Sequence, residues 1–494
     1  MRPDGDTASN WLRDRSNQLL LGVLALASLL RLLYFNINKA EWWDSTLYLL
    51  EAKRLALGIA YAPVYEAHRA PVLPLLGALA YRAGLGEATI LFGILLFSVA
   101  AVYLTHRVGT ILYDRAIGLL AAFLMAVFWE NLFFTQRILT EMPALFFWLL
   151  TVYCYMRGVA RAERSWLYGL VPSFALMFLT QFRTGVLAVP LAPHWLAAGK
   201  WRVLRTREFV CSLALGLLLF LPYVVFSFRT YRVPLGFLKA YQLGNLGTGR
   251  INPSAVFLRY LEYFPRYLGL LLLGLFLYGA IAGIVSLLRE ADAEARKERL
   301  QRAVLMAGLI LFPILAPSFI ERFVHRYAIC AFPAVFLVIA SAAAGITRRL
   351  KTQSRLVAGM FLAGVVVIGA MQQILTADQL IRTESTSYLP VKEAGLWIKE
   401  HSREDDVVVS NSWPQITFYA ERRTVSFPGT EEEFEALLRK SHPRFVMVSV
   451  FEPHPAWVYP YLTRKASALR ESARTGTMNE TETVVYEYAA VVTP

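Results

Sequence analysis

The sequence predicts an α-helical polytopic membrane protein that ends in a small extracytoplasmic α/β domain. Three observations support this fold class. The chain of 494 residues is 56% hydrophobic and only 17% charged, and its apolar residues fall in long runs. Arginine and lysine gather on alternate connections between those runs. After about residue 388 the composition changes, and short apolar segments alternate with amphipathic ones.

Apolar runs divide the first three quarters of the chain. They cover about residues 18–36, 88–108, 114–132, 142–158, 166–182, 185–199, 208–228, 264–288, 302–318, 327–346 and 356–376. Each approaches the ~20 residues that a helix needs to cross a hydrocarbon core of ~30 Å, where a helix satisfies its own backbone hydrogen bonds. The run at 185–199 is shorter and is broken by Pro190 and Pro193. We therefore predict about eleven transmembrane helices within residues 18–376.

The basic residues predict the orientation of these helices in the membrane. They occupy the tail of residues 1–17 and the connections near 107–115, 157–164, 200–207, 289–302 and 348–355. Because cytoplasmic loops carry an excess of Lys and Arg, the N-terminus is expected in the cytoplasm. An odd number of spans then places residues 377–494 outside, on a multi-pass protein of the plasma membrane. The formal charge of +14 is explained by this topology, which argues against a nucleic-acid partner.

The last part of the chain, residues 377–494, predicts the extracytoplasmic α/β domain. "YLPVKEAGLWIKEH" has the spacing of an amphipathic helix, and "VVVSN", "RFVMVSV" and "TVVYEY" are typical of strands. "TEEEFEALLRK" predicts a second helix, opened by Thr430 and Glu433 as a capping box. The segment has no glycine-rich phosphate loop after a strand, so we expect it to support the membrane domain or to recognise an acceptor.

The predicted first outer loop, residues 37–87, contains "KAEWWDSTLYLLEAKR". Asp44, Tyr48 and Glu51 share one face of the helix that this stretch predicts. Trp42 and Trp43 suit the headgroup level of a membrane, where one edge of the ring stays wet. Asp44 has two interpretations. It is either a solvated acid on an interfacial helix, or a general base whose pKa is raised by a partly apolar site.

Two further stretches carry candidate residues on the outer side. "EAHRAPVLPLLGAL" places His68 and Arg69 before a helix that is too short to span, and His68 is either structural or a metal ligand. Glu141, in "LTEMPALFF", begins a predicted span. It either complements the helix dipole or is a second acid that faces the same cavity as Asp44. The sequence leaves open whether Asp44, Glu141 and His68 converge on a divalent metal ion.

Basic residues also occur on the outer side, against the general charge trend. Arg183 lies in "LTQFRTG", and Arg322, His325 and Arg326 lie in "ERFVHRYAICAFPAVF". Basic residues on the disfavoured side need another reason, such as an anionic partner. That partner is either the lipid headgroups in general or a specific lipid phosphate, since Arg grips two phosphate oxygens at once.

The outer connection at residues 229–263 is basic and aromatic, and its "LGNLGTG" predicts mobility. It either closes over an anionic lipid that carries a sugar, with Tyr241 and Arg250 as candidates, or lies passively at the interface.

The order of these motifs, over roughly residues 20–350, resembles the GT-C glycosyltransferases. The nearest group is the protein mannosyltransferases and lipid A aminoarabinose transferases. The resemblance implies an inverting transfer on the outer face, from a polyprenyl- or dolichyl-phosphate sugar to a hydroxyl of a glycan, lipid or protein. It implies no nucleotide sugar and no certain cofactor.

The resemblance also suggests roles for single residues. Asp44 takes the position of the catalytic acid in the first loop, where many members have an Asp-Glu pair; Ser45 replaces the second acid here. Glu141 falls at the second acidic position. Arg183 and Arg326 fall at basic positions near the donor phosphate.

Two other functions stay open at this point. A transporter or flippase of lipid-linked sugars would place its ionisable residues near the middle of the bilayer, whereas here they gather at one face. A sensor would bind its ligand in an α/β domain that works when detached.

Overall fold

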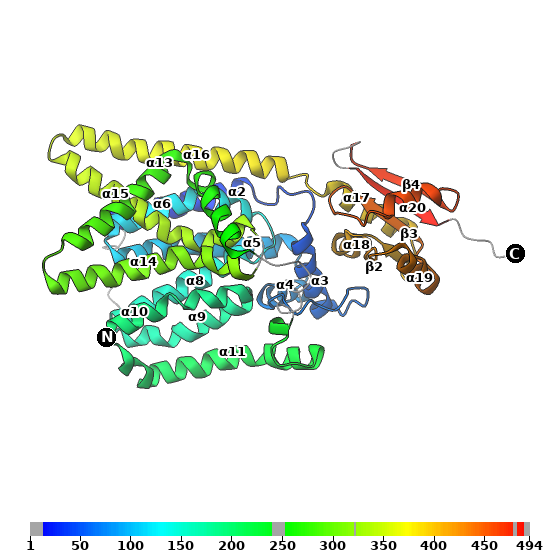
Figure 1. The fold of residues 1–494 in the computed structure, drawn as a ribbon, viewed down its shortest axis with the longest axis horizontal. Coiled ribbons are helices and arrows are strands. Elements are labelled where there is room, and N and C mark those ends of the chain that lie inside the picture. The colour runs from blue at the N-terminus through cyan, green and yellow to red at the C-terminus, as the bar shows by residue number, and fades with distance from the viewer. Residues whose placement is uncertain (1–12, 240–251, 321–322, 478–481, 489–494) are drawn as a thin grey trace.

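The computed structural model describes residues 13–239, 252–320, 323–477 and 482–488. Figure 1 shows an elongated molecule, with a bundle of long helices at one end and an α/β domain at the other. The helix α16 (Arg355–Glu384) leads from the bundle toward the domain, which begins with α17 (Leu389–His401).

Within the described residues, eight helices are long and apolar enough to cross a membrane, and a bent pair makes a ninth. The eight are built on α2 (Arg15–Leu33), α5 (Glu87–Leu112), α8 (Glu141–Tyr155), α11 (Arg207–Tyr231), α13 (Pro253–Arg289), α14 (Ala293–Ile320), α15 (Phe332–Lys351) and α16. The pair is α6 (Arg115–Val127) and α7 (Trp129–Thr135), which meet at 52°. The predicted polytopic membrane fold is confirmed.

Two of the predicted spans are helical but short. The run at 166–182 forms α9 (Leu167–Thr180), of 14 residues. The run at 185–199 forms the 3₁₀ segment η3 (Phe182–Ala188) and α10 (Leu191–Ala198), of 8 residues. The chain breaks at Gln181, whose backbone is extended, and again before Pro190. Among the residues that the structure describes, eight or nine helices, rather than eleven, therefore have the length of a span.

The helices α8 and α15 lie at the centre of the bundle. In the most apolar 18 residues of the spans built on α8 and α15, 83% and 72% of the residues are buried. The corresponding values are 22% for α2 and 17% for α11. Helices buried on all sides carry apolar residues all round, as these two do. Their first residues follow loops at the end of the bundle that faces the α/β domain (Figure 1). Side chains at these two helix starts are therefore held by the most rigid part of the bundle.

The predicted first outer loop, residues 37–87, forms two short helices at that same end of the bundle. They are α3 (Trp43–Leu57) and α4 (Val72–Arg82), which pack against each other. α3 ends at Gly58, whose φ of 69° is the left-handed conformation that glycine adopts without strain. At 11 residues α4 is too short to span, as predicted.

The C-terminal domain contains a five-stranded sheet of order β2-β1-β3-β5-β4. β1 (Val407–Val409), β2 (Arg423–Val425) and β3 (Phe445–Ser449) are parallel, whereas β5 (Thr483–Tyr488) and β4 (Leu469–Thr475) are antiparallel to their neighbours. The helices α18 (Trp413–Ala420), α19 (Glu431–Ser441) and α20 (Val458–Arg464) complete it. The three predicted strands and the Thr430 capping box are confirmed.

The domain is docked on the chain segment that precedes α3. The backbone N–H of Glu41 donates to the Tyr419 hydroxyl at 2.6 Å, and Lys392 Nζ donates to the Lys39 carbonyl at 2.7 Å. Trp43 packs edge-on against Trp413 of α18, with ring centroids 5.7 Å apart. The Trp43 ring therefore packs partly on the domain, and its expected role at the headgroup level stays a prediction.

Candidate active site

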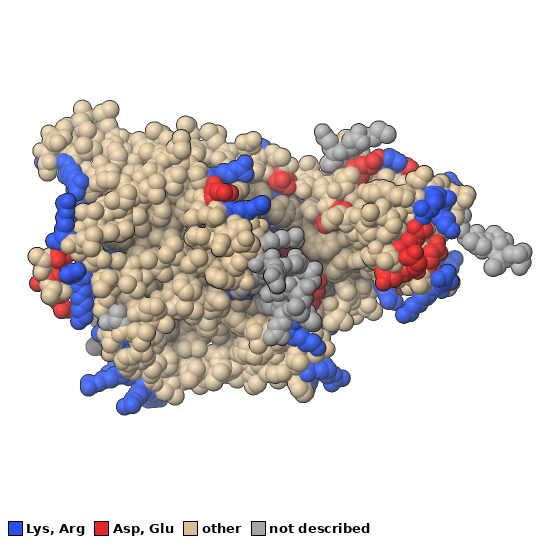
Figure 2. All heavy atoms as spheres, in the orientation of Figure 1, with Lys and Arg blue, Asp and Glu red and all other residues tan. Residues whose placement is uncertain are grey.

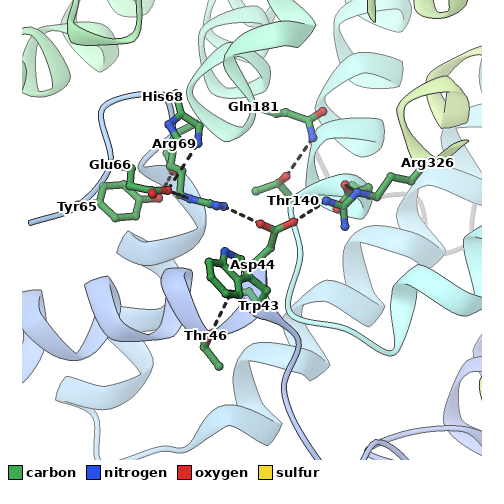
Figure 3. Close-up of polar contacts among 12 residues, drawn as sticks. Trp43, Asp44, Thr46, Tyr65, Glu66, His68, Arg69, Thr140, Gln181 and Arg326 are labelled. Carbon is green, nitrogen blue, oxygen red and sulfur yellow. Dashed lines mark hydrogen bonds and ion pairs between the residues drawn. The ribbon is translucent and has the colours of Figure 1, made fainter. Parts of the chain in front are cut away.

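Asp44 lies in the first turn of α3, between two arginines. Arg69 Nη1 is 3.0 Å from Asp44 Oδ1, and Arg326 Nη2 is 2.5 Å from Asp44 Oδ2. Figure 3 shows the two guanidinium groups reaching Asp44 from opposite sides. The carboxylate side chain keeps 26% of its surface exposed, so it lines an open site rather than the protein core.

The two arginines determine the acidity of Asp44. Burial alone would raise the pKa of this carboxyl, but the charges of Arg69 and Arg326 outweigh burial and hold its pKa at about 2. The expectation of a raised pKa is therefore wrong for the state described. An apolar surrounding raises the pKa only while no cation compensates the charge.

Glu141 is the second acid at the site, as expected. It is the first residue of α8, and its side chain is only 3% exposed. Arg326 Nε lies 3.2 Å and Arg183 Nη2 lies 3.6 Å from Glu141 Oε1. Glu141 Oε2 is buried without a hydrogen-bond partner among the described residues. Arg326 thus bridges the two acids that the sequence singled out.

Arg183 and Arg326 lie on two short 3₁₀ segments of the bundle. Arg183 belongs to η3, and Arg326 to the 3₁₀ segment η5 (His325–Ala331) that precedes α15. The Arg183 guanidinium lies 3.2 Å from the centre of the Tyr327 ring, a cation–π contact. Arg69 also pairs with Glu66, at 2.5 Å, so three arginines meet three carboxylates and their formal charges balance.

A buried pair beside this cluster was not predicted. Glu130, on α7, has no exposed surface, and its Oε1 lies 2.6 Å from His325 Nδ1. The His325 ring stacks between Trp129 and Tyr263, at centroid distances of 6.1 and 5.6 Å. One signal could have found Glu130, since an ionisable residue inside a predicted span usually marks a functional site.

The other sequence candidates lie at different distances from the cluster. Tyr48 contacts the Arg69 guanidinium with its ring, at 5.6 Å. His68 Nε2 lies 3.6 Å from Glu66, and its side chain is 46% exposed. Three of the residues that the sequence suggested, Arg322, Tyr241 and Arg250, lie outside the described residues.

The acids of the cluster do not fit a divalent metal ion. The Arg326 guanidinium occupies the space between Asp44 and Glu141, where a shared ion would have to sit. His68 pairs with Glu66 and does not join them. Within the part of the chain that the structure describes, no three His, Cys, Asp or Glu side chains are grouped to hold a metal.

Comparison with known proteins gives this geometry a context. Residues 68–226 match the family model described as dolichyl-phosphate-mannose-protein mannosyltransferase. The structure superposes on ArnT from Cupriavidus metallidurans, bound to undecaprenyl phosphate, with a TM-score of 0.66 over 96% of this chain and 98% of that chain, at 11% identity. The chain has the fold of the GT-C glycosyltransferases. No curated protein matches it by sequence.

Other GT-C structures show the same fold. The oligosaccharyltransferase AglB from Archaeoglobus fulgidus, in complex with an inhibitory peptide and a dolichol-phosphate, matches with a TM-score of 0.58 and 15% identity over 87% of this chain and 69% of that chain. The arabinofuranosyltransferase AftD from mycobacteria matches with a TM-score of 0.54 and 13% identity over 94% and 40%. A structure of the Archaeoglobus protein holds Zn and sulfate. These matches confirm the fold that the GT-C resemblance predicted.

Proposed function

We propose that the protein is an inverting glycosyltransferase of the plasma membrane. It moves a sugar from a polyprenyl- or dolichyl-phosphate carrier to a hydroxyl of a glycan, lipid or protein on the outer face. One observation carries the proposal: Asp44, on an outer-loop helix, is clamped between Arg69 and Arg326 at the mouth of the bundle. The two groups that the chemistry needs, a base and a phosphate binder, are thereby in contact.

Donor binding and base activation are coupled in this arrangement. The donor phosphate competes with Asp44 and Glu141 for the arginines, since guanidinium groups bind phosphate oxygens as well as carboxylates. As Arg326 turns to the phosphate, Asp44 loses the charge that keeps it acidic, and its affinity for a proton rises. The base is therefore weak until the donor is bound.

The reaction then proceeds as a single displacement. The acceptor oxygen attacks the anomeric carbon while the bond from that carbon to the phosphate oxygen breaks. Asp44 takes the proton of the acceptor hydroxyl, and the bonding electrons leave with the phosphate. Arg69, Arg183 and Arg326 stabilise the second negative charge that the lipid phosphate acquires.

His325 faces the same phosphate region, next in sequence to Arg326. Glu130 holds the His325 ring through Nδ1, and the ring stacks between two aromatic side chains. His325 Nε2 can then contact the donor phosphate. We assign Glu130 as a positioning residue, because its buried carboxylate is hydrogen-bonded to the imidazole.

The surface charge supports the proposed orientation. Lys and Arg side chains gather at the end of the bundle opposite the α/β domain (Figure 2). Cytoplasmic loops are enriched in these residues. The N-terminus then lies in the cytoplasm, and the active site and the C-terminal α/β domain lie outside.

A transfer assay tests this function. The purified protein in liposomes is supplied with polyprenyl- and dolichyl-phosphate sugars carrying a radiolabelled sugar, and with membrane glycan and lipid extracts as acceptors. We expect the label to appear in an acceptor with at least one donor. Movement of labelled donor across the bilayer, without any transfer, would instead establish a flippase.

A further inference from the structure

A tyrosine at the joint between bundle and domain has an unusual backbone. Tyr388 precedes α17 with φ 62° and ψ 7°, the left-handed region that a bulky aromatic residue rarely adopts. Such a conformation persists only where the surroundings enforce it, and it is common at ligand sites. The result is a hydroxyl that donates to Glu452 Oε1 at 3.3 Å.

Glu452 lies just beyond the carboxyl end of β3, which pairs in parallel with β1. In open sheets of this kind, ligands bind beyond the carboxyl ends of parallel strands. The neighbouring Phe451 stacks on the Tyr388 ring, with centroids 4.7 Å apart and planes 29° apart. A half-buried carboxylate therefore stands next to a pair of stacked aromatic rings at the edge where a ligand is expected.

This edge of the domain also lies close to Asp44. Burial raises the pKa of Glu452, the Tyr388 hydrogen bond opposes that rise, and the charge of Asp44 adds to it, so the two carboxylates sense each other. The contact between Trp43, which precedes Asp44, and Trp413, which opens α18, ties the two parts together. The domain thus contacts the helix that carries Asp44.

The two substrates reach the site from different sides. The donor is fixed in the membrane by its lipid, and its phosphate belongs at the arginines of the bundle. The acceptor hydroxyl must approach Asp44 from the opposite, aqueous side, where the domain stands. Aromatic rings with a carboxylate acceptor offer what a sugar needs, because the rings pack on its C–H face and the carboxylate accepts from its hydroxyls.

We propose that Tyr388, Phe451 and Glu452 form an acceptor subsite that binds a saccharide. The inference rests on the proposed function and narrows its acceptor to a glycan or a glycolipid. Glu452 accepts hydrogen bonds from the acceptor sugar and thereby holds the attacking hydroxyl near Asp44.

The same domain supplies a matched control. The Tyr461 hydroxyl donates to Glu435 Oε1 at 2.8 Å, a second tyrosine–glutamate hydrogen bond, and Tyr461 packs in a different part of the domain core from Tyr388. Changes at Tyr461 and Glu435 report the cost to the domain of losing such a bond. Changes at Tyr388 and Glu452 should add an effect on the acceptor.

Saccharide binding is measured with the full-length protein in nanodiscs. Methyl glycosides of glucose, galactose, mannose and arabinose are titrated and followed by saturation-transfer NMR. We expect saturable binding of at least one sugar. Glu452→Gln and Tyr388→Phe should weaken it about tenfold, as loss of a charged hydrogen bond does, whereas Glu435→Gln and Tyr461→Phe leave it unchanged. Absence of saturable binding for every sugar, or equal losses in both pairs, would overturn the subsite.

Asp44→Asn separates this inference from the proposed function. If both hold, Asp44→Asn binds the sugar normally and transfers nothing. If the wild-type protein binds the sugar but transfers no label, the saccharide subsite would be supported and the glycosyltransferase function rejected. Transfer to a peptide acceptor, unaffected by Glu452→Gln, would retain the transferase and reject the saccharide subsite.

Discussion

Arg326 lies between Asp44 and Glu141, 2.5 Å from Oδ2 of the first and 3.2 Å from Oε1 of the second. Asp44 and Arg326 are 282 residues apart in sequence, and the pair joins the outer loop to the start of the central helix α15. A cation shared by two carboxylates can also bind a third anion, and the phosphate of the proposed donor is such an anion. This competition is the centre of the proposed mechanism.

Loss of Arg326 should weaken donor binding. We expect Arg326→Gln to lower the affinity for the lipid-phosphate sugar by about 10- to 100-fold, because a charge-assisted contact to phosphate is lost. Arg326→Lys keeps the positive charge but loses the planar guanidinium group. Its donor affinity should therefore lie between those of the wild type and Arg326→Gln. Donor affinity is measured by titration in nanodiscs. Arg474→Gln, on β4 of the C-terminal domain, is the control. Unchanged donor affinity in Arg326→Gln would remove Arg326 from the phosphate site.

The pH dependence of the rate should differ between free enzyme and complex. In free enzyme Asp44 has a pKa of about 2, so it stays ionised and kcat/KM should show no loss from this group above about pH 4. In the donor complex the arginines turn to the phosphate, the pKa of Asp44 rises, and kcat should fall at a higher pH than kcat/KM. If kcat and kcat/KM fall at the same pH on the acid side, the proposed coupling between donor binding and the pKa of Asp44 is contradicted.

Glu41 should make stability depend on pH. Burial, and then the charge of Glu87, raise the pKa of Glu41 to about 7 at the interface between the first loop and the domain. A carboxyl whose pKa is raised by folding binds its proton more tightly in the folded state, so its contribution to stability is lost as pH rises from about 4.5 to 7. Glu41→Gln should therefore raise the thermal midpoint by a few degrees at pH 8 and leave it unchanged at pH 5. The exposed Glu432→Gln should shift neither, and a shift in Glu41→Gln that is equal at both pH values would refute the assignment.

Glu130 and His325 should act as one unit. Glu130→Gln and His325→Gln are each expected to reduce donor affinity about tenfold, since each removes the oriented imidazole. The double variant should be no weaker than the weaker single variant, because both changes remove the same contact. Fully additive losses in a double-mutant cycle would show that Glu130 acts independently of His325.

The sequence predicted the membrane fold because the apolar runs and basic loops depend only on local composition. It also brought Asp44, Glu141, Arg183 and Arg326 together as site candidates, through an order of motifs that resembles the GT-C proteins. The structure joins all four in one network of ion pairs, and their roles stay a prediction. The strand β4 was missed because "LRESART" carries three charged residues and lies at the edge of the sheet, where no apolar pattern is required.

What the sequence could not predict depends on contacts between distant segments. The acidity of Asp44 follows from its ion pairs with Arg69 and Arg326, which no local pattern predicts. Glu130 belongs to an apolar stretch, and only the meeting of α7 with η5 gives it a partner. The contact of Trp43 with Trp413 likewise requires the domain to fold back on the first loop.

The turnover of Asp44→Asn, at saturating donor and acceptor, tests the central claim most directly. Asparagine keeps the size of the side chain but cannot take the acceptor proton. We predict that kcat falls by about 10²- to 10⁴-fold, with donor affinity unchanged or tighter because Arg69 and Arg326 are released. Asp14→Asn is the control, since Asp14 also pairs with an arginine, Arg115 at 2.9 Å, and lies next to α2 at its N-terminal end. Wild-type turnover in Asp44→Asn would contradict the account.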